Sequence, residues 1–103
     1  MKGIGDMQKM LRQAQEMQER IQKEMAALRV EGSSGGGMVT VVLDGNKSPV
    51  SLKIDPEVVT KDDVDMLQDL ILAAFHDAEA KVNAALSEKL GALGAGLKIP
   101  GLS

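Results

Sequence analysis

Three groups of residues are the candidates for chemistry. His76 is the one histidine, but no nucleophile motif or oxyanion site accompanies it, so a structural or surface role is the simpler interpretation. Asp62, Asp63 and Asp65 could begin a carboxylate metal site, yet acids are common in the first turn of a helix and no further ligands follow. The glycine-rich run at 32–37 lacks the Gly-Lys-Ser/Thr sequence and the following helix of a phosphate loop.

The rest of the chain adds no catalytic motif. It has no cysteine, which excludes disulfides and thiolate-bound metals. No apolar run approaches the roughly 20 residues that span a bilayer, and the N-terminus lacks the apolar segment of a signal peptide. We therefore expect a cytoplasmic protein that is not an enzyme, with no cofactor, no metal, no small-molecule substrate and no membrane partner.

The middle of the chain, residues 35–59, predicts a β-hairpin. Its apolar residues alternate with a period of two on both sides of Asp44-Gly45-Asn46. Glycine and asparagine favour hairpin turns because they tolerate a positive φ. An isolated hairpin is marginal in water, so the flanking segments must cover it. The alternating residues are Val39, Val41 and Leu43 before the turn and Val50, Leu52 and Ile54 after it.

The first flank predicts a long helix over residues 4–28, since it has no proline and no glycine after Gly5. Asp6 is the expected N-cap or first-turn acid. Arg29-Val30-Glu31 follows and could begin a further short strand. Apolar residues recur at spacings of three and four, close to a heptad seam: Met7, Met10, Ala14, Met17, Ile21, Met25 and Leu28.

The second flank predicts a helix from about Asp62 to near Leu90, ended by Gly91, Gly94 and Gly96. Thr60 and Asp63 have the spacing of an approximate capping box at its start. The apolar residues along this helix have the same spacing, and their side chains become smaller, mostly alanine, in its C-terminal half, which permits close helix packing. The seam comprises Val64, Leu67, Ile71, Ala74, Ala78, Val82 and Ala85, with a second edge of Leu70, Leu72, Phe75 and Leu86.

These elements predict an α+β fold with a two- to three-stranded antiparallel sheet between two long helices. One domain is expected over 1–90, followed by a flexible Gly/Pro-rich tail over 91–103. Only 1% of the residues are aromatic, so the core must be aliphatic and methionine-rich. A small sheet and two long helices cannot cover all these apolar stripes, and we therefore expect a two-fold homodimer.

Charge is distributed unevenly along the chain, whose net charge is −3. Residues 1–29 carry six cations and four anions, a net +2, whereas residues 55–82 carry two and eight, a net −6. The total argues mildly against nucleic acid, because phosphate binding needs a positive surface. Any polyanion should therefore meet the first helix and not the start of the second.

The order of helix, glycine-rich turn, hairpin and helix closely resembles the YbaB/EbfC family of nucleoid-associated proteins. The most specific segments are the glycine-led strand GGGMVTVVLDG, Lys53-Ile54-Asp55-Pro56-Glu57, and Asp69-Leu70-Ile71 with Ala73-Ala74-Phe75. The resemblance covers residues 1 to about 90. It implies a tweezer-like homodimer whose helical arms bind double-stranded DNA, in the cytoplasm and associated with the nucleoid, contributing to nucleoid organisation and gene expression.

The resemblance attributes DNA contacts to the helical arms, and so implies a set of basic positions there. The residues alone leave an alternative open: a protein-interaction module whose methionine-rich first helix and tail dock another protein, with incidental DNA affinity. The implied DNA-binding positions are Lys2, Lys9, Arg12, Arg20, Lys23, Lys81 and Lys89.

Overall fold

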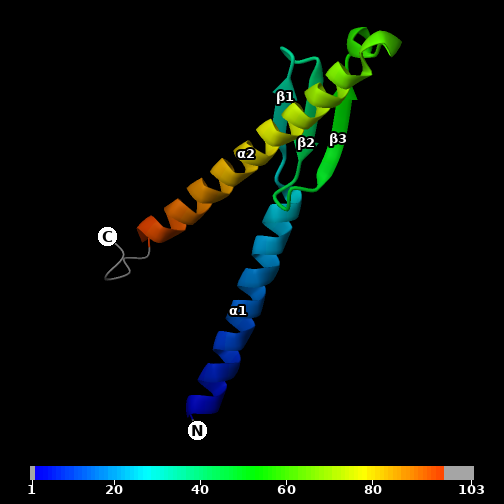
Figure 1. Ribbon diagram of the computed structural model, residues 1–103. Helices are drawn as coiled ribbons and strands as arrows, with labels where there is room; N and C mark the ends of the chain where they lie inside the picture. The colour runs from blue at the N-terminus through cyan, green and yellow to red at the C-terminus, as the bar shows by residue number, and fades with distance from the viewer. Residues whose placement is uncertain (1, 97–103) are drawn as a thin grey trace.

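The computed structural model describes residues 2–96 and has the predicted order of helix, sheet and helix (Figure 1). Helix α1 spans Lys2–Ala27, and strands β1, β2 and β3 span Val30–Ser34, Val39–Leu43 and Pro49–Ile54. Two short 3-10 turns, η1 at Pro56–Val58 and η2 at Lys61–Asp63, lead into α2 at Val64–Gly96. The molecule is elongated, measuring 75 × 29 × 16 Å.

The three strands form one antiparallel sheet in the order β1-β2-β3, and α2 crosses its β1 and β2 side (Figure 1). The period-two prediction for β2 is confirmed, because alternate residues of this strand are buried beneath α2. The helix contributes small side chains to the same core, which lets it lie close to the sheet. The buried apolar residues are Val39, Val41, Leu43, Val58, Ala74, Ala78 and Val82.

Strand β1 extends into the glycine-rich run that the sequence predicted as a flexible turn. Gly32 belongs to the strand and is buried against α2. The turn itself is Gly35, Gly36 and Gly37, with φ values of 59°, 69° and 94°. These angles lie in the left-handed region that L side chains rarely adopt, so glycine is needed there. The first half of the run is therefore structural sheet and the second half is the connection.

The helix ends differ from the sequence predictions. Asp6 does not cap α1, which begins four residues earlier at Lys2 and has no acid in its first turn. The Thr60–Asp63 capping box is also wrong, because η2 occupies these positions and Thr60 makes no side-chain cap. Asp63 is the cap of α2 instead: its Oδ1 accepts a hydrogen bond from the Met66 N–H at 3.0 Å, the geometry that satisfies a free N–H of the first turn.

The C-terminal end of α2 extends beyond its predicted limit. Gly91 and Gly94 do not end the helix, which continues to Gly96. Glycine weakens a helix by about 1 kcal/mol per residue but does not block it as proline does. The boundary between a domain over 1–90 and a tail over 91–103 therefore falls inside a helix, and it stays a prediction. Residues 97–103 of that tail lie outside the described residues.

Candidate nucleic-acid interface

Helix α1 projects from the sheet, and within residues 2–96 it meets the rest of its protomer only near its C-terminal end (Figure 1). Residues 3–24 are all exposed, and only Met25 becomes half-buried where the helix reaches the sheet. In the described part of the chain, one hydrogen bond joins α1 to the sheet, from the Gly45 N–H to the Met25 carbonyl oxygen at 2.8 Å. We call this projecting helix the α1 arm.

Four of the predicted DNA-binding residues share one side of the α1 arm. At about 100° per residue, Lys9, Arg12, Arg20 and Lys23 fall within about 80° of one another around the helix axis. All four are exposed. The methionine-rich seam lies on the opposite side of the same helix, so covering the seam would leave these cations facing outward. We call these four residues the cationic face.

The cationic face also contains an acid. Glu16 lies four residues from both Arg12 and Arg20, on the same side of the helix. Its carboxylate is exposed and forms no ion pair among the described residues. Glu16 therefore lowers the net positive charge of the face, and its charge is a convenient variable for testing whether this face binds phosphate.

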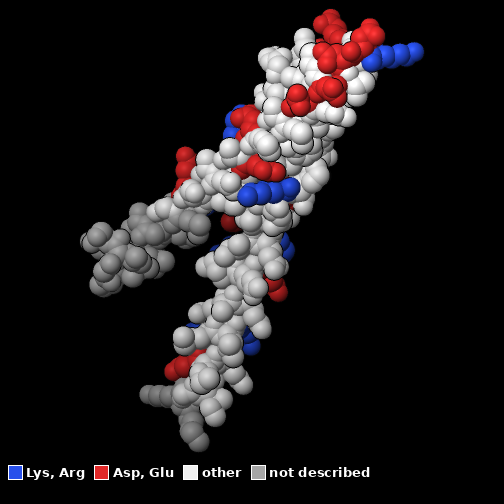
Figure 2. Space-filling view, viewed as in Figure 1, with Lys and Arg blue, Asp and Glu red and all other residues white. Residues whose placement is uncertain are grey.

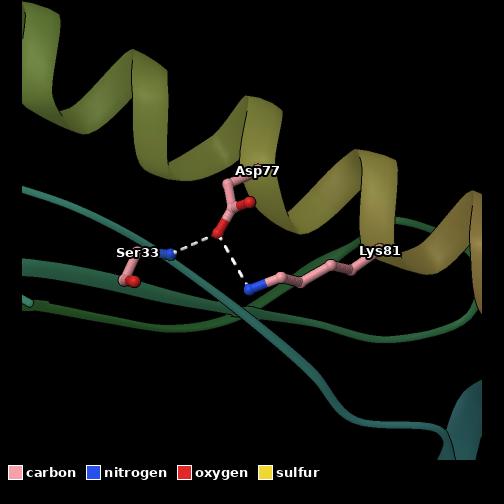
Figure 3. Close-up of polar contacts among 3 residues, drawn as sticks. All are labelled: Ser33, Asp77 and Lys81. Atoms are coloured by element: carbon pink, nitrogen blue, oxygen red, sulfur yellow. Dashed lines mark hydrogen bonds and ion pairs between the residues drawn. The ribbon is translucent and has the colours of Figure 1, made fainter.

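The other three predicted positions are not part of this group of four. Lys2 begins α1, but its side chain lies outside the described residues. Lys89 is exposed on the distal half of α2. Lys81 is engaged within its own helix, since its Nζ lies 3.0 Å from Asp77 Oδ2 (Figure 3). The structure thus places five of the seven predicted residues on α1, four of them with described and exposed side chains, and leaves Lys81 and Lys89 on α2.

The carboxylate of Asp77 links α2 to the edge of the sheet (Figure 3). Its Oδ2 accepts a hydrogen bond from the Ser33 N–H of β1 at 2.9 Å. This backbone donor first, and then the Lys81 ammonium, hold the pKa of Asp77 below the ordinary value of an aspartate carboxyl. Ser34 adds a second link, because its hydroxyl donates to the Leu70 carbonyl of α2. These bonds tie α2 to the outer edge of β1, so the role of this cluster is structural.

The end of the molecule opposite the α1 arm is acidic. Figure 2 shows acidic side chains gathered where the 3-10 turns lead into α2. Such a surface repels a polyanion, and it lies far from the cationic face. Two of these acids are helix caps. Asp63 caps α2, and Asp55 caps η1 by accepting a hydrogen bond from the Glu57 N–H. The acids in and beside these turns are Asp55, Glu57, Asp62, Asp63 and Asp65.

Sequence reasoning overlooked two exposed cations on the β2–β3 hairpin. Lys47 lies in its turn with a φ of 65°, and Lys53 lies on β3. The turn residues Gly45 and Asn46 were expected to supply the positive φ, but Lys47 adopts it instead. Charge alone could have drawn attention to both lysines, although nothing in their spacing separates them from ordinary surface residues.

Residues 2–96 offer little support for other kinds of site. Neither α1 nor α2 is apolar over a long enough stretch to cross a membrane. Within the same described part, no three His, Asp or Glu side chains lie close enough together to hold a metal ion. His76 is exposed on the surface of α2.

Comparison with known proteins identifies the family. Residues 1–97 match the YbaB/EbfC DNA-binding family. The chain is 48% identical over 98 residues to a nucleoid-associated protein of Brucella ovis and 47% identical to one of Brucella melitensis, covering 92% of each chain in both cases. An uncharacterized protein of Helicobacter pylori has a similar fold, with a TM-score of 0.69 over 84% of this chain and 91% of that chain at 21% identity. Because the family match spans both helices and the sheet, and the relatives agree over nearly their full length, this chain belongs to the YbaB/EbfC DNA-binding family.

Proposed function

We propose that this member of a DNA-binding family is a nucleoid-associated homodimer whose α1 arms contact the phosphates of duplex DNA. The observation that carries the proposal is the cationic face: four exposed cations on one side of a helix whose residues 3–24 no described part of the protomer buries. Cations in such a row bind phosphates without reading base sequence. The nucleoid association comes from the names of the Brucella relatives.

The homodimer is proposed from apolar surface that one protomer leaves open. The seam of α1 exposes large side chains along its whole length, and β3 exposes two more. An unpartnered apolar stripe of this length indicates an interface, because a monomer rarely exposes so much apolar surface on one element. The side chains are Ile4, Met7, Met10, Leu11, Met17 and Ile21 on α1 and Val50 and Leu52 on β3, each between 45% and 67% exposed.

A salt-titrated DNA-binding experiment tests the role of the arm. Reversing charge in Arg12→Glu/Arg20→Glu should weaken binding to all duplex sequences, and the slope of log K against log salt should fall by about 0.9 for each phosphate that is no longer neutralised. Glu16→Gln should strengthen binding, because it removes the acid that lies four residues from both arginines on the cationic face. The matched control is Lys53→Glu/Lys61→Glu, which makes the same change in charge away from the arm and should leave the slope unchanged.

Circular dichroism and mass in solution complete this experiment. Both arm variants should keep the helical content and the dimer mass of the wild type, since the cationic face lies opposite the seam. Wild-type DNA affinity in Arg12→Glu/Arg20→Glu would refute the assignment to the arm. An equal weakening in the Lys53→Glu/Lys61→Glu control would show that net charge, not the cationic face, decides binding.

The methionine-rich seam is also the observation that favours a protein-interaction module. Methionine side chains adapt to varied partner surfaces, and those of α1 are exposed in the protomer. The same mass measurement separates the two functions. A dimer that buries the seam supports the DNA-binding arm, whereas a monomer that captures one other protein in a fixed ratio after nuclease treatment supports the module.

A further inference from the structure

We infer that the backbone of Gly45 sets the angle at which the α1 arm leaves the sheet. Gly45 lies in the β2–β3 turn and is buried, although its neighbour Asn46 is exposed. The consequence for DNA, that this angle orients the cationic face, rests on the proposed function. The geometric claim does not, because it concerns one helix and one turn of the same chain.

The first support is the hydrogen bond between these elements. The last carbonyl groups of a helix lack intrahelical partners and must be satisfied from outside. The Arg29 guanidinium donates to the carbonyls of Ala26 and Leu28 at 2.7 and 3.0 Å. The Met25 carbonyl instead accepts from the Gly45 N–H at 2.8 Å. Beyond its covalent link to β1 through Leu28 and Arg29, the end of α1 is therefore held to the β2–β3 turn by this hydrogen bond.

The second support is the lack of space at Gly45. A Cβ there would lie 2.7 Å from the Met25 carbonyl oxygen and 2.9 Å from the Met25 Cα. Both are backbone atoms of α1, so no side-chain rotation could relieve the contact. The φ of Gly45 is not in the left-handed region, which among residues 2–96 holds Lys47 and the glycines of the β1–β2 turn. Glycine at this position thus serves close approach and not a special backbone angle.

The third support is that the turn is rigid. The Asp44 carboxylate accepts from the backbone N–H groups of Asn46 and Ser48 at 2.8 and 2.9 Å. The Asp44 N–H donates to the Ser48 carbonyl at 3.0 Å, and the Lys47 N–H donates to the Asp44 carbonyl at 3.1 Å. These four bonds fix the turn relative to the sheet. The Gly45 N–H therefore points in a fixed direction, and α1 must align with it.

The length of α1 amplifies any change at this contact. To bring the Gly45 Cβ from 2.7 Å to an ordinary contact of 3.4 Å, Met25 must move by about 0.7 Å. Met25 lies three residues, or about 4.5 Å, from Leu28, the first residue after the helix. Pivoting there, α1 would rotate by about 9°. Gln8, about 30 Å from the pivot, would then move by about 5 Å.

Distances between spin labels test this inference directly. The chain has no cysteine, so introduced cysteines can be labelled cleanly. Gln8→Cys on the α1 arm would be paired with Ser51→Cys on β3 and, separately, with Ser87→Cys on α2; all three positions are exposed. Dilution with an excess of unlabelled protein keeps each measured distance within one chain. Two reference positions are needed because a rotation can leave a single distance unchanged.

The expected results differ between variants of the same turn. Gly45→Ala should shift at least one of the two distances, by up to about 5 Å. Asp44→Ala, which removes the acceptor for Asn46 and Ser48, should broaden both distance distributions. Asn46→Ala should change neither, since only the backbone of Asn46 bonds within the turn. Unchanged distances in a folded Gly45→Ala would overturn the inference. If Gly45→Ala does not fold, unchanged widths in Asp44→Ala overturn it.

DNA binding by the same variants separates this inference from the proposed function. A shifted arm accompanied by weaker binding supports both. A shifted arm with wild-type affinity and salt slope supports the role of Gly45 and contradicts the role of the arm in DNA binding. Unmoved labels contradict the role of Gly45, whatever the affinity.

Discussion

Gly32→Ala perturbs the closest approach between α2 and the sheet. A Cβ at Gly32 would lie 2.3 Å from the backbone nitrogen of Ala78 and 2.6 Å from the carbonyl oxygen of Ala74. Because both are backbone atoms of a helix, neither can move alone. To reach an ordinary contact of 3.4 Å, α2 must lift from β1 by about 1 Å. The whole helix, and not one side chain, therefore responds to this substitution.

The free-energy cost of Gly32→Ala follows from the contacts between α2 and the sheet that this movement would weaken. Overpacking a core costs about 1–3 kcal/mol when neighbouring side chains can adjust. Here the helix must also draw Ala74 and Ala78 away from the buried residues of β2 and stretch the bond from the Ser33 N–H to Asp77. We therefore expect Gly32→Ala to lower the free energy of unfolding by at least about 3 kcal/mol.

Urea denaturation at one fixed protein concentration measures this destabilisation, since the stability of the proposed dimer would depend on concentration. The control is Gly91→Ala on α2, where a Cβ meets no atom within 4 Å and should stabilise by about 0.5–1 kcal/mol. Adding Ala78→Gly to Gly32→Ala should not restore stability, because the clash is with backbone atoms. A destabilisation below about 1 kcal/mol in Gly32→Ala, or a rescue by Ala78→Gly, would refute this reasoning.

Three further predictions concern single interactions of the fold. The pKa of Asp77 is lowered on folding, so its carboxylate stabilises the native state above its unfolded pKa, and this contribution is lost as the pH falls. The difference in unfolding free energy between wild type and Asp77→Asn should therefore be constant above about pH 5 and shrink below about pH 4. Asp63→Ala removes the cap of α2 and should cost about 1 kcal/mol by urea denaturation, whereas Asp62→Ala, which caps nothing, should cost much less. Val41→Ala opens space in the core and should cost about 2–3 kcal/mol in the same assay, compared with a small effect for Thr40→Ala on the other face of β2; equal effects at Val41 and Thr40 would contradict the assigned faces.

The sequence predicted those parts of the fold that depend on local periodicity. The alternation of Val39, Val41 and Leu43 identified the buried face of β2, because a strand places alternate side chains on opposite faces. The three-four spacing identified both helices and the seam of α1, which is exposed in the protomer as an interface between copies requires. The side on which the cations of α1 lie also follows from spacing alone.

The roles that the sequence did not predict depend on contacts with other segments of the chain. Gly45 has the sequence context of a turn glycine, but its reason for being glycine is Met25, twenty positions earlier. Gly32 stands in a glycine-rich run, and only its place beneath Ala78 separates it from the turn that follows. Asp63 became the cap of α2 because a 3-10 turn precedes the helix, and such turns leave no clear pattern in the residues.

The two edge strands of the sheet, β1 and β3, differ in how freely they could pair with another copy, and this difference limits the size of an assembly. Asp77 accepts from the Ser33 N–H and the Ser34 hydroxyl donates to the Leu70 carbonyl, so α2 is tied to the outer edge of β1, where a neighbouring strand would have to pair. Strand β3, at the opposite rim, carries exposed Val50 and Leu52 and has no such cover among the described residues. An exposed edge strand can pair with a strand of another copy, and a sheet with two exposed edge strands could add copies indefinitely. Two copies that paired through β3 would each have β1 at the outer edge of the joint sheet. Because α2 is tied to that edge in both copies, strand pairing would stop at the dimer and would not continue into fibres.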